Sequence, residues 1–380
     1  MMWMRSVQLR EAVPFSVMVT MEGCTIILTI WAKTVMTVDG MSPFVFVVYT
    51  HALSSLILLL YSFIFNCPRN RGRREQSLFS LNLFVRCFFL GLTGITISQN
   101  LGFLGLSYSS PILVCAMGLM IPTFSFLLSI ILRRTRLDWR SLSFQAKVSG
   151  TIISIIGAVA VELYKGAYIR TSSVSSSPGK QLQVLAQKAL LVFSSEPTEH
   201  WVVGGILLAS ASLSVSVWNI IQLGTMKLYP EVEAIEVVTF YSLLGTIQSA
   251  ILSLFLERNP SAWRLKLNME LLLIILTAIF GGLVRSRVHN WCMSIKGPYY
   301  VPLFKPFGIV FATIFGVSLS ANSLHYGSVI GSVVIGMGYF VISWGQIRED
   351  EEQQDQQCVD ERLEPNSERK VPLLQEENNV

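Results

Sequence analysis

A lone carboxylate, Glu22, is the residue of this sequence that is most suited to chemistry. It lies inside an uncharged, largely apolar segment that begins at Val13 and extends to Trp31. A carboxylate this deep in an apolar helix cannot reach bulk water, so it must face a cavity, pair with a cation or carry a proton. We expect Glu22 to bind a small solute or to couple proton movement. The alternative is a neutral, hydrogen-bonded glutamic acid that holds neighbouring helices together.

A second charged candidate, Lys305, stands next to Pro306 in another apolar segment. Its side chain is long enough either to extend to water at the end of a helix or to meet an anionic group of a solute. Pro122 lies at a similar place in the first half of the chain, and Pro302 precedes Lys305. A proline inside a helix removes a backbone hydrogen bond, and the carbonyl that it frees is available to a ligand or a hinge.

Two polar pairs, Gln99-Asn100 and His289-Asn290, are predicted to end the third apolar segment of each half of the chain. Each pair is followed by a short connector and then by a proline-bearing segment. If the two halves are inverted in a membrane, the pairs lie toward opposite faces, and we expect them to act as gates.

Further imidazole, amide and aromatic side chains inside apolar segments are candidates for the wall of a solute site. These residues are His51, Trp218, Gln222, Tyr241, Gln248 and Trp291. Their alternative roles are hydrogen bonding between helices for the histidine and anchoring at the membrane interface for the tryptophans. By contrast, Arg86, Arg285 and Arg287 are expected to extend to water from the ends of helices and to take no part in the site.

Several classes of protein are disfavoured by the residue pattern. The six cysteines form no Cys-x-x-Cys pair, and the chain has no P-loop, zinc-ligand spacing or nucleophile–base pair. We therefore expect no metal, no cofactor and no enzyme activity. The net charge of +5 arises from clustered basic residues without interleaved aromatics, which argues against a nucleic-acid partner.

The elements that hold these residues are predicted to be membrane-spanning helices. The 380-residue chain is 52% hydrophobic and only 14% charged, with a mean hydropathy of +0.53, which indicates lipid as its main solvent. We predict an all-α membrane protein with ten transmembrane helices, approximately at 13–35, 42–65, 80–102, 110–132, 148–164, 201–222, 235–256, 270–288, 299–319 and 327–345. Its expected partners are the lipid bilayer and a small-molecule substrate, and its oligomeric state is left open.

A pattern of small residues in the region of the fifth segment recurs in the tenth. Two sets have the same spacing and lie 181 positions apart: Ala146, Gly150 and Gly157, and Gly327, Gly331 and Gly338. Residues at these intervals fall on one helical face and let two helices pack closely in a membrane. Because five is an odd number, repeats of five helices enter the membrane in opposite orientations, which is typical of secondary transporters.

These patterns divide the chain into two inverted five-helix repeats, 13–165 and 201–346, joined by an outer linker, 166–200. An acidic tail, 347–380, is expected to be disordered. Basic clusters follow the second and fourth segments, whereas the connectors after the third and ninth carry no Lys or Arg. By the positive-inside rule both termini are cytoplasmic.

Several motifs occur in one order along the chain. They are Gly40-Met41-Ser42-Pro43, Gln99-Asn100-Leu101, Pro122-Thr123-Phe124, Lys296-Gly297-Pro298, Phe304-Lys305-Pro306 and Trp344-Gly345. Over about residues 10–348 the chain resembles the plant nodulin-like, walls-are-thin-related family. These proteins are also called usually-multiple-acids-move-in-and-out transporters and belong to the EamA-type drug/metabolite transporter superfamily. Pro122 matches the proline of the family's fourth span, and Lys305-Pro306 match the pair of its ninth span. Thr135 and Ala321-Asn322 stand where that family usually has an acidic residue.

The resemblance implies two EamA-like bundles of five helices in a plant plasma membrane or, alternatively, a vacuolar membrane. It also implies a facilitator or exporter that moves amino acids or similar small metabolites by alternating access. Transport of auxin or another organic acid is the first alternative. The second is a membrane scaffold or sensor that transports nothing and recruits partners through its acidic tail.

Overall fold

The computed structural model describes residues 2–65, 81–133, 139–163, 201–229, 232, 234–265, 268–296, 300–319 and 326–363. The linker expected at 166–200 and the last part of the tail, 364–380, lie outside the described residues. Every regular element in the described part of the chain is a helix.

The first half of the chain forms helical rods, some of which contain more than one segment. α1 (Met2–Thr34) continues into the π-helical η1 (Val35–Asp39). Gly40 follows η1 as its C-cap and has a left-handed φ of 73°. The other elements are α2 (Pro43–Phe65), the continuous rod of α4 (Leu81–Gly91), η2 (Leu92–Ile97) and α5 (Ser98–Tyr108), the broken rod of α6 (Pro111–Gly118) and α7 (Ile121–Ile131), and α8 (Leu142–Leu163).

The second half of the chain also forms helical rods. Its elements are α10 (Trp201–Leu228), α11 (Ala234–Leu256), the short η3 (Pro260–Trp263), the continuous rod of α12 (Met269–Ile279), η4 (Phe280–Val284) and α13 (Arg285–Lys296), then η5 (Pro302–Phe304), α14 (Phe307–Leu319) and α15 (Tyr326–Leu363). The third rod of each half thus contains a π-helical segment, η2 in one and η4 in the other.

The helices have the length and surface expected of membrane spans. In the described part of the chain, nine helices are long and apolar enough to cross a membrane, and Pro302–Phe315 forms a shorter apolar helix. Large side chains such as Ile156, Leu254 and Phe255 point away from the protein, since more than half of each is exposed. Lipid covers such surfaces in a membrane protein. The prediction of an all-α, multi-pass membrane protein is therefore confirmed.

Two rods extend beyond their predicted limits, so the polar pairs lie inside helices rather than at their ends. The third rod runs to Tyr108 instead of 102, and the eighth runs to Lys296 instead of 288. Polar residues are tolerated there because neighbouring helices satisfy them. The amide of Asn100, for example, donates a hydrogen bond to Ser249 Oγ at 2.9 Å.

α15 also differs from the expectation, because it continues as a helix to Leu363 and includes the first half of the tail that was expected to be disordered. The Glu, Gln and Arg residues of this stretch have good helix propensity. Arg348 and Glu352, one turn apart, form an ion pair of 3.6 Å that supports the helix after it leaves the apolar region.

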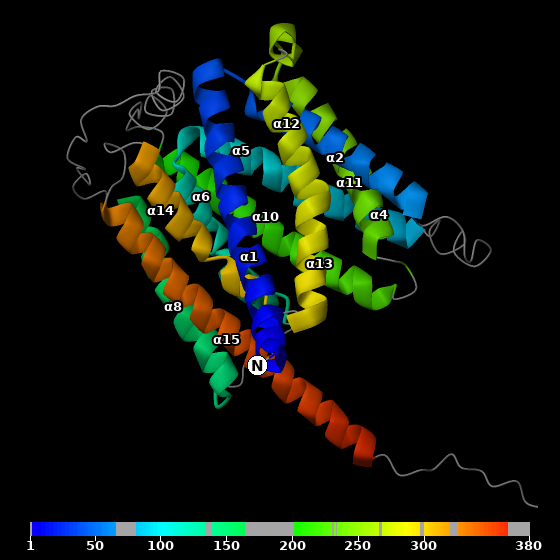
Figure 1. Cartoon of the computed structure of the whole chain (residues 1–380), viewed down its shortest axis with the longest axis vertical. Helices are drawn as coiled ribbons and strands as arrows, with labels where there is room; N and C mark the ends of the chain where they lie inside the picture. The colour runs from blue at the N-terminus through cyan, green and yellow to red at the C-terminus, as the bar shows by residue number, and fades with distance from the viewer. Residues whose placement is uncertain are drawn as a thin grey trace, which may run out of the picture.

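The two halves of the chain interlock and do not form two separate bundles. α10 packs on α5 and α7, α11 on α2 and α4, α12 on α2, and α1 on α14. Figure 1 shows α8 and α15 side by side at one edge, with the N-terminus and the far end of α15 at the same end of the molecule. Helices from both halves therefore surround the interior of the bundle.

The α8–α15 pair holds together through the small residues of the repeated motif. A Cβ atom built on Gly338 would lie 2.7 Å from the carbonyl oxygen of Gly150, and one on Gly331 would lie 3.0 Å from that of Gly157. The two backbones are therefore in direct contact, and a larger side chain at these positions has no space. The helices run antiparallel, because the earlier glycine of α8, Gly150, faces Gly338, whereas the later one, Gly157, faces Gly331.

The ends of the α8–α15 pair are also closely packed. Ala146 lies against Gly345, and Gly327 is buried in the first turn of α15. The ammonium of Lys147, which is 3% exposed, forms an ion pair with Glu349 of α15. Burial of Lys147 is tolerated because its charge is neutralised there.

Candidate functional site

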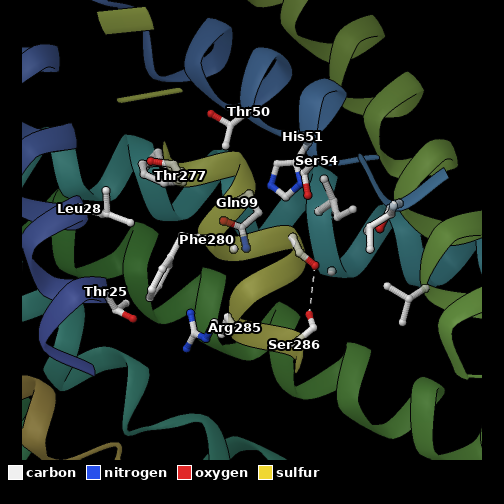
Figure 2. A pocket seen from close by; sticks show the side chains of 18 of the residues that line it. Thr25, Leu28, Thr50, His51, Ser54, Gln99, Thr277, Phe280, Arg285 and Ser286 are labelled. Carbon is white, nitrogen blue, oxygen red and sulfur yellow. Dashed lines mark hydrogen bonds between the residues drawn. The ribbon is translucent and has the colours of Figure 1, made fainter. Parts of the chain in front are cut away.

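A cavity of about 450 Å³ lies between the two halves of the chain. Its wall is made by α1, α2, η2 and α5 of the first half and by α10, α11, α12, η4 and α13 of the second. Figure 2 shows side chains from these helices converging on one space, among them Gln99 and Arg285. Both halves therefore contribute to a single candidate binding site.

The π-helical segments η2 and η4 both border the cavity, and each contains a glycine that admits a side chain from the opposite half. A Cβ atom on Gly94 would collide with the indole of Trp218, and one on Gly282 would collide with the hydroxyl of Ser54. π-Helical turns are frequent at functional sites. Here Arg285 follows η4 directly, as the first residue of α13.

Arg285 supplies the positive charge of the cavity. No other Asp, Glu, Lys or Arg lines it in the described part of the chain, and no ion pair of Arg285 is found there. Figure 2 shows the guanidinium reaching into the space that Gln99 and Phe280 also enter. A guanidinium presents several N–H donors in one plane and binds a carboxylate through two hydrogen bonds.

Hydroxyl and amide groups form most of the remaining polar wall. The lining side chains of this kind are Thr25, Thr29, Thr50, Ser54, Gln99, Ser242, Thr277 and Ser286. Some hydroxyls donate to their own helix, as Ser286 does to Gly282 O at 3.3 Å, and their oxygens can still accept a hydrogen bond. Two buried groups of the wall, Thr277 Oγ1 and Trp218 Nε1, have no partner among the described residues. Such groups cost free energy until a ligand or water satisfies them.

Aromatic rings complete the wall. Trp218 and Tyr241 meet edge to face with ring centroids 6.1 Å apart, and Phe46 and Phe103 do so at 4.9 Å. Phe280 also lines the cavity, and Figure 2 shows its ring near Arg285. A cation, several hydrogen-bonding groups and flat apolar surfaces together suit a small amphipathic anion or zwitterion.

The residues predicted for the wall fall into two groups. Those that line the cavity are His51, Gln99, Trp218 and Tyr241. Those that do not are Gln222, His289 and Trp291. The side chain of Asn290 lies outside the described part of the structure, although its backbone belongs to α13.

Asn100 and Gln248 connect helices outside the cavity. The amide of Asn100 donates to Thr96 O at 2.7 Å and to Ser249 Oγ at 2.9 Å. Gln248 accepts a hydrogen bond from Thr96 Oγ1 at 3.2 Å and donates to Phe88 O at 3.1 Å. These bonds fix α11 against the third rod of the first half, so both residues support the wall that Gln99 enters.

Glu22 and Lys305 pair with each other instead of lining the cavity. Glu22 Oε1 and Lys305 Nζ are 3.5 Å apart, and the pair links α1 to the turn between η5 and α14. The carboxylate also lies close to the start of α14, because a Cβ atom on Gly308 would be 3.9 Å from Glu22 Oε2. The positive end of that helix dipole adds to the charge of Lys305. Of the three outcomes expected for Glu22, the structure shows pairing with a cation.

The proline in span nine frees a carbonyl, and a neighbouring helix takes it. Pro306 cannot donate to the oxygen of Pro302, and the hydroxyl of Tyr339 in α15 donates to that oxygen at 2.8 Å. This bond ties the irregular turn before α14 to α15.

The break beside Pro122 is held in a similar way from α10. Ser212 donates to Met117 O at 2.7 Å, and Ser216 donates to Ile121 O at 2.9 Å. Both oxygens flank the turn between α6 and α7. At both prolines, therefore, backbone atoms at the irregular turn have protein partners.

Arg285 is the functional candidate that sequence reasoning missed. It was expected to extend to water like Arg287, whose guanidinium does leave the site and packs 4.2 Å from the ring centroid of Tyr61. The available signal was the pair Gly281-Gly282 just before Arg285, since adjacent glycines inside an apolar helix mark a close approach or an irregular turn. No group of three or more His, Cys, Asp or Glu residues that could hold a metal ion occurs in the described ranges.

Several relatives of this chain carry the same family name. The WAT1-related protein At1g70260 of Arabidopsis thaliana is 55% identical over 379 residues, which cover 97% of this chain and 98% of the relative. The WAT1-related protein At1g60050 of the same plant is 50% identical, and 95% of each chain is covered. At5g40240, another WAT1-related protein of that plant, is 39% identical over 90% of this chain and 89% of its own.

Two further comparisons add little. No family model matches the chain. A solved crystal structure aligns with 85% of this chain and 96% of its own, at 17% identity and a TM-score of 0.46. The curated relatives, by contrast, agree over nearly the whole sequence and confirm the resemblance carried by the motifs. The chain belongs to the WAT1-related family of plant multi-pass membrane transporters, which are not enzymes.

Proposed function

We propose that this chain moves small metabolites that bear a carboxylate, namely amino acids or related organic acids, through the cavity by alternating access. The observation that carries this proposal is the position of Arg285 as the charged residue of a cavity of about 450 Å³ between the two halves. A space of this size is in the usual range for binding a small molecule. Its net charge favours an anionic group over a cation.

Each part of the wall has a role in this proposal. Arg285 binds the carboxylate, while Gln99 and the hydroxyl groups accept hydrogen bonds from an ammonium or another polar group of the solute. Phe280 and Trp218 pack against its apolar part. Thr277 Oγ1 and Trp218 Nε1, which have no partner in the described structure, gain one when the solute is present.

Two features support alternating access by inverted repeats. The α8–α15 contact is reciprocal, since Gly150 faces Gly338 and Gly157 faces Gly331, as a twofold axis between equivalent helices requires. In addition, η2 and η4 occupy the third rod of each half and border the same cavity. We place both termini in the cytoplasm and the chain in the plasma membrane, with the vacuolar membrane as the alternative.

An organic acid such as auxin is the second candidate substrate. No carboxylate lines the cavity in the described part of the chain, so no fixed negative charge is available there for the ammonium of an amino acid. The aromatic rings of Trp218, Tyr241 and Phe280 also suit a flat apolar group. A monocarboxylate without an amine satisfies this wall as well as a zwitterion does.

Uptake into proteoliposomes tests both candidates with matched solutes. Tryptophan is compared with indole-3-acetate, and phenylalanine with 3-phenylpropionate, so that each pair tests the contribution of the amine. We expect Arg285→Gln to reduce uptake of every accepted carboxylate by about 10- to 100-fold, because a hydrogen bond to a charged group contributes about 1.5–3 kcal/mol.

Arg287→Gln is the control, since Arg287 lies on the same helix and does not line the cavity. The proposal fails if the wild-type chain takes up none of these carboxylates, or if the two arginine variants have equal activity. The first result would favour a scaffold or sensor that transports nothing.

A further inference from the structure

The ion pair between Glu22 and Lys305 lies next to the cavity, on the side from which α1 begins. Glu22 precedes Thr25, a residue of the wall, by about one helical turn. In Figure 1, α1 starts at the end of the molecule that carries the N-terminus, and it contacts both α13 and α14 along its length. The pair is therefore on the way from the cavity to that end of the molecule.

The two partners of this pair are covered by protein to different extents. The side chain of Glu22 is 6% exposed, whereas that of Lys305 is 36% exposed. An ammonium in contact with lipid at this depth would be strongly destabilised. About a third of the Lys305 side chain is therefore left uncovered by the protein, and this part is open to a second anion.

Positive charge continues from the cavity to this pair. Arg285 lines the cavity, and it is close enough to Lys305 for the two cations to interact through space. The positive potential of these two groups attracts an anion along the path as it moves away from Arg285.

We propose that Lys305 is a second binding station for the carboxylate of the transported solute, and that Glu22 occupies this station when no solute is there. This inference rests on the proposed function, because it assigns a step to the same solute. The incoming carboxylate replaces Glu22 as the partner of Lys305, and Glu22 returns when the solute leaves. No bond is made or broken in this exchange.

Electrostatics explains why a fixed counter-ion is useful at this station. An unpaired ammonium and an anion far from it are both costly in a medium of low dielectric constant, so Lys305 keeps a carboxylate partner at each stage. The start of α14 near Glu22 Oε2 stabilises either carboxylate. Competition from Glu22 also limits the affinity for the solute, which allows the solute to leave.

A purely structural ion pair makes a different prediction, and the double variant Glu22→Gln/Lys305→Gln separates the two. Neutral replacement of both partners leaves no uncompensated buried charge, so it costs much less stability than the removal of one partner. If the pair is structural, transport by the double variant equals that of wild type. If Lys305 is a station, transport falls by about tenfold or more, while equilibrium binding of the solute to the Arg285 site changes by less than about threefold.

A matched control is present in the same chain. Lys147 and Glu349 form another Lys–Glu pair, on the α8–α15 edge and away from the cavity. The double variant Lys147→Gln/Glu349→Gln should keep wild-type transport. Binding is measured with radiolabelled solute in detergent, transport in proteoliposomes and thermal unfolding on the same preparations.

Glu22→Gln alone gives a second test that does not need the double variant to fold. Removing the competing carboxylate should lower the dissociation constant of the carboxylate solute by about tenfold and slow its release, so that turnover falls. A weaker or unchanged affinity contradicts the proposal.

The outcomes also separate this inference from the proposed function. Wild-type transport by Glu22→Gln/Lys305→Gln overturns the second station alone. Loss of both binding and transport in that variant overturns it too, because Lys305 would then belong to the Arg285 site. If the wild-type chain transports no carboxylate at all, the proposed function itself is wrong.

Discussion

The α8–α15 edge and the cavity both depend on glycine, but for opposite purposes. At the edge, Gly150 and Gly338 bring two backbones into direct contact and leave no space for a side chain. At the cavity, Gly94 makes room for the indole of Trp218, which comes from the other half of the chain. No space is left between the two helices at these glycines, whereas about 450 Å³ remain open in the cavity.

The polar groups of the two regions differ in the same sense. Lys147 at the edge is neutralised by Glu349. In the cavity wall, no ion pair of Arg285 and no hydrogen-bond partner of Thr277 Oγ1 is found among the described residues. Complete pairing of polar groups stabilises the fold, whereas unpartnered groups are stabilised only when a ligand binds to them. Stability and solute binding therefore depend on different parts of this bundle.

The largest effect on stability is expected for Gly338→Ala at the edge. The added methyl group would lie 2.7 Å from Gly150 O, so the helices must separate, at a cost of about 1–3 kcal/mol. Gly336→Ala is the control, because a Cβ atom there meets nothing within 4 Å. Thermal unfolding in detergent should show a lower Tm for Gly338→Ala only. Equal Tm values for the two variants would show that the edge is not closely packed.

A smaller effect, on transport rather than stability, is expected for Gly94→Ala in η2. The methyl group would displace the indole of Trp218 from the wall, and we expect the apparent affinity for the solute to fall by about tenfold, equivalent to about 1.4 kcal/mol. Gly102→Ala, where a Cβ atom meets nothing within 4 Å, should transport normally. Uptake at increasing solute concentration measures both. Unchanged affinity in Gly94→Ala would remove Trp218 from the binding site.

The smallest effects are expected from hydroxyl groups. Their removal should change stability in opposite directions in the cavity wall and at a contact between helices. Thr277→Val removes a buried hydroxyl without a described partner, so stability should rise by up to about 1 kcal/mol while affinity for the solute falls a few-fold. Ser216→Ala removes a bond to Ile121 O and should lower stability by about 0.6 kcal/mol with no change in affinity. Unfolding and binding are measured on the same samples. A loss of stability in Thr277→Val would place that hydroxyl among the structural ones.

Most of the fold could be predicted because lipid imposes a simple rule on the sequence. Apolar segments long enough to cross a membrane predicted the helices. The glycine spacing predicted a face for close packing, but it did not show that α8 and α15 are each other's partners. The predicted ends of the third and eighth helical rods lie too early in the sequence. Polar residues such as Asn100 continue a helix when another helix satisfies them, and sequence alone does not show that partner.

The site was only partly predictable, since it depends on contacts between distant segments. Glu22 and Lys305 each stood out as charges in apolar segments, but their pairing joins two ends of the chain. Gln99 and Trp218 were recognised by residue type, whereas Arg285 was assigned to a helix end. It lies inside a continuous rod instead, because α13 follows η4 directly and carries the helix on to Lys296.

Direct backbone contact along α8 and α15 restricts the movement of one helix against the other. Neither can slide or rotate without forcing a side chain into the main chain of the other, so the pair moves as one body. In the alternating access that we propose, we expect the other helices to move relative to this edge. Spectroscopic labels on its exposed surface, at Ile156 and Met337, therefore hold a constant separation and give a fixed reference for following the motion of the rest of the bundle.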